Sequence, residues 1–324
     1  MLTARQDPAA DNPGSLGLES RAAGRRGPRR TSLWRSVSGV LFMAPALVVL
    51  LVFWLVPLVL VVVFSLFHWD YGTNPDFVGT EQYHIVLSDP LFLQAVLTTL
   101  VFAAVVVAVG TAFSLLVAVV LYGEVQARGL FRSLVFLPYV MPMVATSTIW
   151  LWMFQPGSGV VDRLMHAVGL PGQVAWLNSS TLALAALCIY TVWYGFGFTT
   201  LLFTAGLTAI PSEVLNAGLV DGAGTWQRFR YLVWPLLTPT TLFVVVVNTI
   251  SSFQAFTQIY ALTRGGPVNA TTTLTYYIYE TAFTYFHFGA ASASAVVLFV
   301  FVVVLTATQF LLSRRYVFYD EATA

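Results

Sequence analysis

Six stretches of the chain contain no Asp, Glu, Lys or Arg, and they limit the possible folds more than any other feature. They cover residues 36–69, 90–123, 133–161, 164–212, 231–263 and 281–313. Each is longer than the roughly 20 apolar residues that a helix needs to cross a bilayer. Charged residues make up 9% of the chain, against about 25% in soluble domains. We therefore predict an all-α membrane protein whose six spanning helices lie near residues 38–66, 92–121, 132–154, 181–208, 233–262 and 288–313.

Arginine predicts the orientation of these helices, because the chain has no lysine and all 15 of its Lys-or-Arg residues are arginine. With a cytoplasmic N-terminus, 13 arginines fall in cytoplasmic segments and only Arg163 and Arg264 in external loops. Such a bias follows the positive-inside rule. We expect both termini and the loop at 209–230 to be cytoplasmic, and the loops at 70–90, 155–180 and 263–287 to be external.

The ends of the chain are predicted to lie outside the bundle. Residues 1–35, rich in Arg, Gly and Pro, bury too little apolar surface to order themselves and are expected to form a disordered cytoplasmic tail. A cleaved signal is the alternative, but its apolar core would be only about 7–15 residues long. The transmembrane domain is then 36–316, followed by a short cytoplasmic tail at 317–324.

Several function classes are excluded or disfavoured. Without lysine there is no Walker A loop, so the chain is not a P-loop ATPase. A single cysteine and four scattered histidines give no metal-ligand spacing, so no metal site is expected. Uncharged spans disfavour ion-coupled transport, which uses ionisable groups at membrane depth. We also find no nucleophile–base pair or paired carboxylates of the kind an enzyme would need.

One segment rich in small residues, 211–224, is suited to docking against another protein. It reads Pro-Ser-Glu-Val-Leu-Asn-Ala-Gly-Leu-Val-Asp-Gly-Ala-Gly. Pro211 and Glu213 favour the start of a short helix. Ala217 and Gly218 would let a partner backbone approach closely, and the turn at 221–224 contains glycines that permit positive φ.

This segment resembles the cytoplasmic coupling loop of permease subunits in binding-protein-dependent ABC importers. The family pattern is Glu-Ala-Ala, three residues, Gly, nine residues, an aliphatic residue, any residue, Leu and Pro. Gly222 and Pro235 keep that spacing, with Asn216 in place of the glutamate and Trp234 in place of the leucine. The missing carboxylate would affect charge pairing with the ATPase at position 216. It would not affect the shape of the docking loop. The residues expected to couple to the ATPase are Glu213, Asn216, Ala217, Gly218, Asp221, Gly222, Ala223, Arg228 and Pro235.

The resemblance covers about residues 38–316. It includes Leu137-Pro138-Tyr139, the run 150–154, Gly265-Gly266-Pro267 with the threonines that follow, and residues 296–310. It is closest to the A-type permeases for glycerol-3-phosphate and glycerophosphodiesters such as glycerophosphocholine, while permeases for disaccharides share most of these features.

The resemblance implies a type I importer permease fold in the bacterial inner membrane. It implies as partners a second homologous permease, two ATPase subunits that bind ATP and Mg²⁺, an external solute-binding protein and membrane lipid. This chain itself would bind no cofactor or nucleic acid and would catalyse no reaction. A disaccharide or other sugar is the alternative solute. A passive channel or secondary transporter, with the segment 211–224 as a simple connector, is the alternative function.

Polar side chains recur along the fifth predicted helix at helical spacing. They could line a cavity for a hydroxylated solute, or they could form hydrogen bonds between helices. The aromatic run 193–198 could form a binding shelf or simply pack closely. The candidate pathway residues are Tyr194, Asn248, Ser251, Ser252, Gln254 and Gln258.

Three local expectations complete the sequence prediction. Pro138 and Pro142 should kink the third helix. Asp162 and Arg163 should form a solvated pair. The loop at 263–287 should be either an amphipathic segment bordering the pathway or an ordinary connector.

Overall fold

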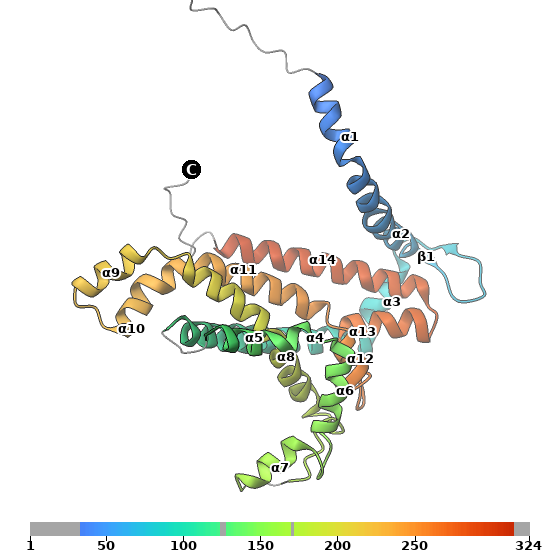
Figure 1. Ribbon diagram of the computed structural model, residues 1–324. Helices are drawn as coiled ribbons and strands as arrows, with labels where there is room; N and C mark the ends of the chain where they lie inside the picture. Colours follow the sequence, from blue (N-terminus) through green and yellow to red (C-terminus); the bar gives the residue numbers. More distant parts are fainter. Residues whose placement is uncertain (1–32, 124–127, 170–171, 314–324) are drawn as a thin grey trace, which may run out of the picture. The chain divides into compact units, whose positions relative to one another are not determined.

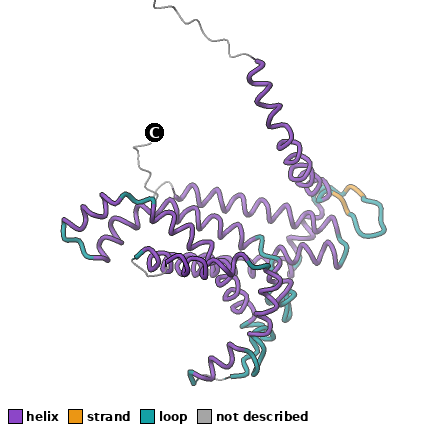
Figure 2. The backbone as a smooth tube through the Cα atoms, viewed as in Figure 1, coloured by secondary structure: helices purple, strands orange, loops and turns teal. Residues whose placement is uncertain are grey.

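The computed structural model describes residues 33–123, 128–169 and 172–313. These residues form helices and one short hairpin (Figures 1 and 2). The elements are α1 (Leu33–Leu50), η1 (Leu51–Leu55), α2 (Val56–Phe64), β1 (Phe67–His68), β2 (Asp76–Phe77), α3 (Glu81–Ser88), α4 (Pro90–Tyr122), α5 (Arg128–Val140), α6 (Met143–Met153), α7 (Val160–Ala167), α8 (Ala183–Thr208), α9 (Ser212–Val220), α10 (Thr225–Arg228), η2 (Phe229–Val233), α11 (Trp234–Phe253), α12 (Thr257–Leu262), α13 (Leu274–Tyr279), η3 (Glu280–Thr284) and α14 (Phe288–Ser313).

The chain divides into two units at Val56 and Pro57. In the first unit, α1 leads directly into the π-helical segment η1, none of whose side chains is buried. The second unit contains everything from Pro57 onward. Most of the predicted tail at 1–35 and all of the tail at 317–324 lie outside the described residues, and the helix α1 already begins at Leu33.

Within the described residues, five helices are long and apolar enough to cross a membrane, and a sixth span exists if the bent pair α5–α6 is one span. The sequence predicted this span as a kinked helix over 132–154. The helix instead breaks after Val140 and turns by 95° before Met143. Pro142 lies inside this break, and a proline both lacks an N–H donor and disfavours helical conformation in the residue before it.

The fifth predicted helix, 233–262, has different ends in the structure. A continuous helix begins at Thr225 with α10 and ends at Phe253, and α12 follows after a break of three residues. The π-helical turn η2 ends at Val233, two residues before Pro235, whose ring nitrogen cannot donate a backbone hydrogen bond. The wider turn accommodates this missing donor, so the helix runs through Pro235 from Thr225, whereas the sequence predicted a helix that begins near 233.

Helices α4, α8 and α11 pack together as the centre of the second unit. Small residues allow the close contacts that membrane helices use. A Cβ atom on Gly206 of α8 would come within 2.5 Å of Thr240 Oγ1 on α11. A Cβ atom on Gly197 would collide with the backbone of Val135 in α5. One face of the aromatic run 193–198 is therefore used for packing.

The stretch at 263–287 is a folded part of the second unit. Thr271, Thr272 and Thr273 are buried, and the Thr275 hydroxyl donates to the Phe253 carbonyl at 2.7 Å. That bond satisfies a carbonyl left free where α11 ends, which matters in a bilayer without water.

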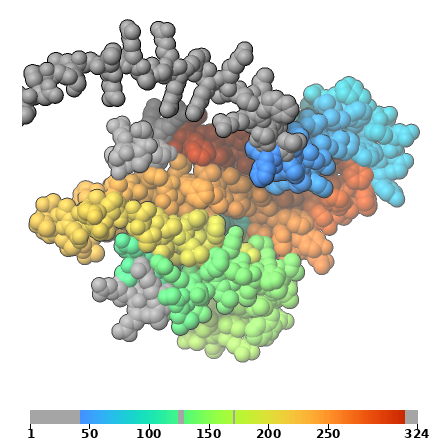
Figure 3. Space-filling view, turned by 45° about the horizontal axis from the view of Figure 1, so that its top comes forward, coloured from blue at the N-terminus to red at the C-terminus, as the bar shows by residue number. Residues whose placement is uncertain are grey.

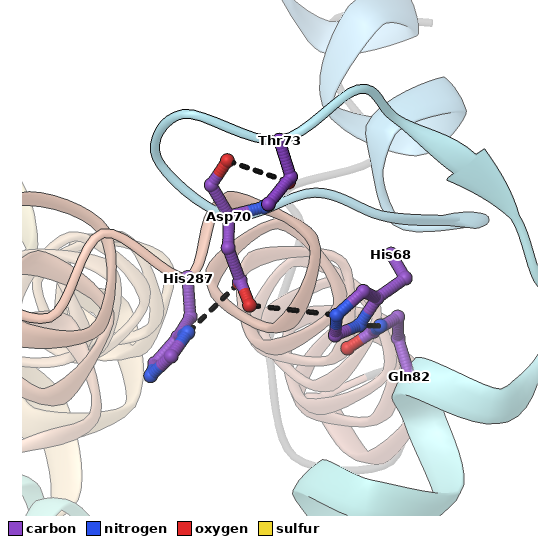
Figure 4. Close-up of polar contacts among 5 residues, drawn as sticks. All are labelled: His68, Asp70, Thr73, Gln82 and His287. Carbon is purple, nitrogen blue, oxygen red and sulfur yellow. Dashed lines mark hydrogen bonds and ion pairs between the residues drawn. The ribbon is translucent and has the colours of Figure 1, made fainter.

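The segment after α2 is tied to the start of α14 (Figure 4). The Asp70 carboxylate lies 2.8 Å from Nδ1 of His287 and 3.4 Å from Nε2 of His68. The Gln82 amide nitrogen lies 3.0 Å from the other His68 nitrogen. The backbone N–H of Phe288 donates to the Trp69 carbonyl at 2.9 Å.

Asp162 does not form the predicted solvated pair with Arg163. Its side chain is buried, and its carboxylate accepts hydrogen bonds from the Gly157 N–H at 2.7 Å and from the Trp176 indole at 3.2 Å. The Gly157 bond is the main reason why the pKa of Asp162 is lowered. Asp162 therefore organises the loop between α6 and α8.

Candidate functional site

A cavity of about 540 Å³ lies between α8, α11 and the α5–α6 bend. Its wall contains all six side chains that the sequence predicted for a solute pathway: Tyr194, Asn248, Ser251, Ser252, Gln254 and Gln258. Their role in transport stays a prediction, but the polar stripe borders open space.

The local structure explains why these residues meet. Asn248 and Ser251 lie on the last turns of α11, and the break after Phe253 carries Gln254 and Gln258 to the same wall. The Asn248 amide also contacts the neighbouring helices. Its oxygen accepts from Thr199 of α8 at 3.4 Å, and its nitrogen donates to Thr111 of α4 at 3.4 Å. The polar stripe thus serves both as cavity wall and as interhelical contact.

Tyr194 fixes the bend of the third span to this cavity. Its hydroxyl donates to the carbonyls of Tyr139 at 3.3 Å and Met141 at 3.2 Å, two groups that the helix break leaves unpaired. Tyr139 stacks on Phe198 with ring centroids 4.8 Å apart, and both line the cavity. Sequence reasoning did not select Tyr139 or Phe198 for the pathway. The Leu137-Pro138-Tyr139 motif beside the predicted kink is the one sequence feature that could have indicated a pathway role for Tyr139.

The cavity wall is polar and aromatic but carries no charge. Its described lining combines amides and hydroxyls with the rings of Tyr139, Tyr194, Phe198 and Phe256. Asp, Glu, Lys, Arg and His are all absent from this lining. Such a wall can hydrogen-bond to hydroxyl groups and cover the apolar faces of a small molecule.

The predicted coupling segment protrudes at one end of the second unit (Figures 1 and 3). Its helix α9 ends in a Schellman motif, in which the Ala223 N–H donates to Gly218 O at 2.9 Å and the Gly222 N–H to Leu219 O at 3.1 Å. Gly222 has a φ of +75°, so the turn requires the conformational freedom that glycine supplies.

The surface of this segment is rich in exposed apolar side chains. Val220 is 88% exposed and Trp226 is 72% exposed. Glu213, Asn216 and Ala217 are also exposed on α9. Exposed apolar residues together with small and polar ones are typical of a protein contact surface.

Gly218 has a different role from the one expected. It is buried by its own chain, where a Cβ atom would lie 2.6 Å from Leu232 and 3.5 Å from the Arg228 side chain. The prediction that a partner backbone approaches at Gly218 is therefore wrong. Gly218 instead lets α9 pack on η2, and Leu215 of α9 packs against the core cluster that joins α4, α8 and α11.

Arg228, Pro235 and Asp221 complete the predicted set. Arg228 lies half-buried on α10, and its Nε atom has no hydrogen-bond partner within the described residues. Pro235 lies in the first turn of α11, and Asp221 is the C-terminal cap residue of α9. The described residues contain no group of three or more His, Cys, Asp or Glu that could hold a metal ion.

Comparison with known proteins decides the family. Residues 110–317 match the family described as binding-protein-dependent transport system inner membrane component. The chain belongs to this family. The permease is 32% identical over 278 residues to an sn-glycerol-3-phosphate transport system permease protein of Pectobacterium atrosepticum, covering 85% of this chain and 94% of the relative. It is 35% identical over 262 residues to a lactose transport system permease protein of Rhizobium radiobacter, covering 79% and 87%.

The fold of the permease agrees with this assignment. The crystal structure of a bacterial alginate ABC transporter, in complex with an alginate pentasaccharide-bound periplasmic protein, contains a chain that matches with a TM-score of 0.77. The two chains are 20% identical, and the match covers 87% of this permease and 97% of that chain. The permease therefore has the type I importer fold and is a multi-pass, non-catalytic subunit of a sugar-type ABC importer in the bacterial inner membrane.

Proposed function

We propose that this permease forms one half of a solute pathway, with the 540 Å³ cavity as its solute site and α9 as its contact with an ATPase. The observation that carries the proposal is the cavity itself, because polar and aromatic residues from three separate segments converge on it. The exposed coupling segment on the same unit provides a surface through which movement of the ATPase can be transmitted to the permease.

The uncharged wall favours a solute without net charge. The sequence resemblance pointed to glycerol-3-phosphate or glycerophosphodiesters, and relatives for both glycerol-3-phosphate and lactose support a small hydroxylated solute. A phosphate monoester would need cationic or strong N–H donors to offset its desolvation. We therefore place a neutral disaccharide or other sugar, or the zwitterion glycerophosphocholine, ahead of glycerol-3-phosphate.

The proposed assembly contains four kinds of partner. A second homologous permease completes the pathway, and an external solute-binding protein delivers the solute. Two ATPase subunits bind ATP and Mg²⁺ beneath the cytoplasmic coupling loops, and membrane lipid surrounds the bundle. This chain binds no cofactor of its own.

Contacts within the chain support a route for the mechanical signal. A displacement of α9 would act on η2 through Gly218 and Leu232, and on the core cluster through Leu215. The same cluster contains residues of α4, α8 and α11, the helices that border the cavity. Closure of the ATPases would thus move the cavity walls.

Uptake by the reconstituted transporter tests the proposal. The assembled complex in proteoliposomes is given the external binding protein and labelled lactose, glycerophosphocholine or glycerol-3-phosphate. We expect ATP-dependent uptake of an uncharged or zwitterionic probe. Uptake that continues without ATP would favour a passive channel, and uptake of glycerol-3-phosphate alone would reject the assignment of an uncharged solute.

A pair of variants at Gly222 tests the docking role of α9. In Gly222→Leu the bulky side chain must adopt a φ of +75°, so we expect the ATPase to be lost on copurification. Gly222→Asn is the control, because asparagine tolerates this conformation. Equal ATPase recovery and equal transport for both variants would show that α9 is not part of the coupling interface.

A further inference from the structure

A second group of aromatic side chains lies at the end of α11 away from the coupling segment (Figure 1). Helix α11 has 20 residues and so separates the two ends by about 30 Å. We name this group the α12–η3 aromatic cluster, and it consists of Phe256, Tyr260, Tyr276, Tyr279 and Phe283.

The rings of this cluster form a continuous path to the cavity. Phe256 lines the cavity, and its ring centroid lies 5.6 Å from that of Tyr260 and 4.9 Å from that of Tyr279. Tyr279 in turn lies 5.5 Å from Phe283. The outer rings reach the surface, where Tyr260 is 42% exposed and Phe283 is 64% exposed.

Two charged side chains lie beside these rings. The Arg264 guanidinium is 5.9 Å from the centre of the Tyr260 ring. Arg264 has a φ of +51°, an uncommon conformation for a residue other than glycine, and such strain clusters at functional sites.

Glu280 lies at the inner side of the same cluster. Its carboxylate lies beside the Tyr276 side chain, and partial burial raises the pKa of Glu280. Burial and the neighbouring Glu280 raise the pKa of Tyr276 to about 12. Within the described part of the chain, Glu280 takes part in no ion pair.

This combination fits a carbohydrate or polyol. The C–H face of a sugar ring can lie on an electron-rich aromatic face, while its hydroxyls bond to charged groups at the rim. Tyrosines that only anchor a protein in the headgroup region would form a belt around the bundle. Here the rings contact one another and lead to Phe256 at the cavity.

We propose that the α12–η3 aromatic cluster is a second subsite for the transported sugar or polyol, occupied before the solute enters the cavity. Tyr260 supplies the stacking face, and Arg264 and Glu280 supply a donor and an acceptor for hydroxyl groups. The inference rests on the proposed function, which makes this end of the permease the external one.

The test uses the complete transporter in proteoliposomes, with its external binding protein and labelled lactose as the probe. If wild type does not take up lactose, the labelled solute that it does take up in the panel above replaces it. Tyr260→Ala should lower the uptake rate by about 3- to 10-fold, because the stacking face is lost. Tyr260→Phe keeps the ring and should stay close to wild type. Tyr285→Ala is the matched control, since Tyr285 is 56% exposed and lies outside the cluster. ATPase copurification and binding-protein affinity are measured for each variant.

Three results would overturn the proposal. Tyr260→Ala could transport like wild type, or Tyr260→Phe could fail as badly as Tyr260→Ala. A loss of uptake accompanied by weaker association of the binding protein would identify the cluster as a protein contact. If wild type shows no ATP-dependent uptake of any probe, the proposed function itself fails, and that outcome is distinct from all three.

Discussion

The two faces of α8 border two cavities of opposite character. One face contributes Thr191, Tyr194 and Thr199 to the polar cavity. The other contributes Ile189 and Val192 to an apolar groove of about 710 Å³ between α4, α6 and α8. Adjacent residues Trp193 and Tyr194 belong to different cavities, so aromatic content alone does not mark the pathway. In a bilayer, where an apolar groove can face lipid, hydroxyl and amide groups identify the functional face.

The largest predicted effect concerns two glycines of this helix. In Gly197→Ala the new methyl group would collide with the backbone of Val135 and Phe136, which cannot rotate away. We expect a destabilisation of about 3 kcal/mol or more and little assembled transporter. Gly195→Ala is the matched control, because a Cβ atom at Gly195 meets nothing within 4 Å.

Thermal stability and the yield of the assembled complex measure this contrast. Similar yields of complex for Gly197→Ala and Gly195→Ala would mean that α5 and α8 are not in close contact. The uptake rate of Gly195→Ala is a second measurement, which reports on the cavity. The new methyl group would project into the polar cavity and leave the helix packing unchanged.

The next effect is on the polar face alone. Asn248→Leu removes the amide that contacts both Thr111 and Thr199, while side-chain volume changes little. We expect uptake to fall about 30-fold, since an unpaired polar partner and a lost solute contact each cost about 1 kcal/mol. Ile189→Leu on the apolar face is the control. Equal uptake rates for the two variants would show that the Asn248 amide makes no solute contact that transport needs.

How far the sequence predicts this site depends on the kind of interaction. The uncharged stretches predict the spans, because burial in lipid acts on whole segments. The spacing of Asn248, Ser251 and Ser252 predicts a shared face, since helical geometry alone determines it. All of these residues do line one cavity.

Other features depend on contacts that no local pattern reveals. The sequence indicated a kink near Pro142 but not a bend of 95°, which needs the Tyr194 hydroxyl to satisfy the exposed carbonyls of Tyr139 and Met141. The role of Gly218 was mistaken for a similar reason, because its neighbour Leu232 is brought near by the turn at 221–224. Asp162 likewise finds Trp176 only through the folding of a loop.

A smaller effect is expected where Tyr194 supports that bend. Tyr194→Phe keeps the ring, whose centroid lies 5.8 Å from that of Tyr139, but it removes both hydrogen bonds to the bend. Each bond is long, so we expect uptake to fall only about 2- to 5-fold. Uptake kinetics and thermal stability of the assembled complex measure the change. A loss as large as that of Asn248→Leu would make the hydroxyl a direct solute contact.

The smallest effect is predicted on the apolar face. Ile189 is 46% exposed in the groove, and acyl chains can fill the space that Ile189→Ala opens. Because lipid tails are as apolar as the side chain they replace, no large hydrophobic term is lost. Uptake and the yield of the complex should stay within about twofold of wild type. A marked fall in yield, with uptake per complex unchanged, would show that another protein surface covers the groove. The two faces of α8 would then differ in their partner, and the apolar one would belong to a subunit interface.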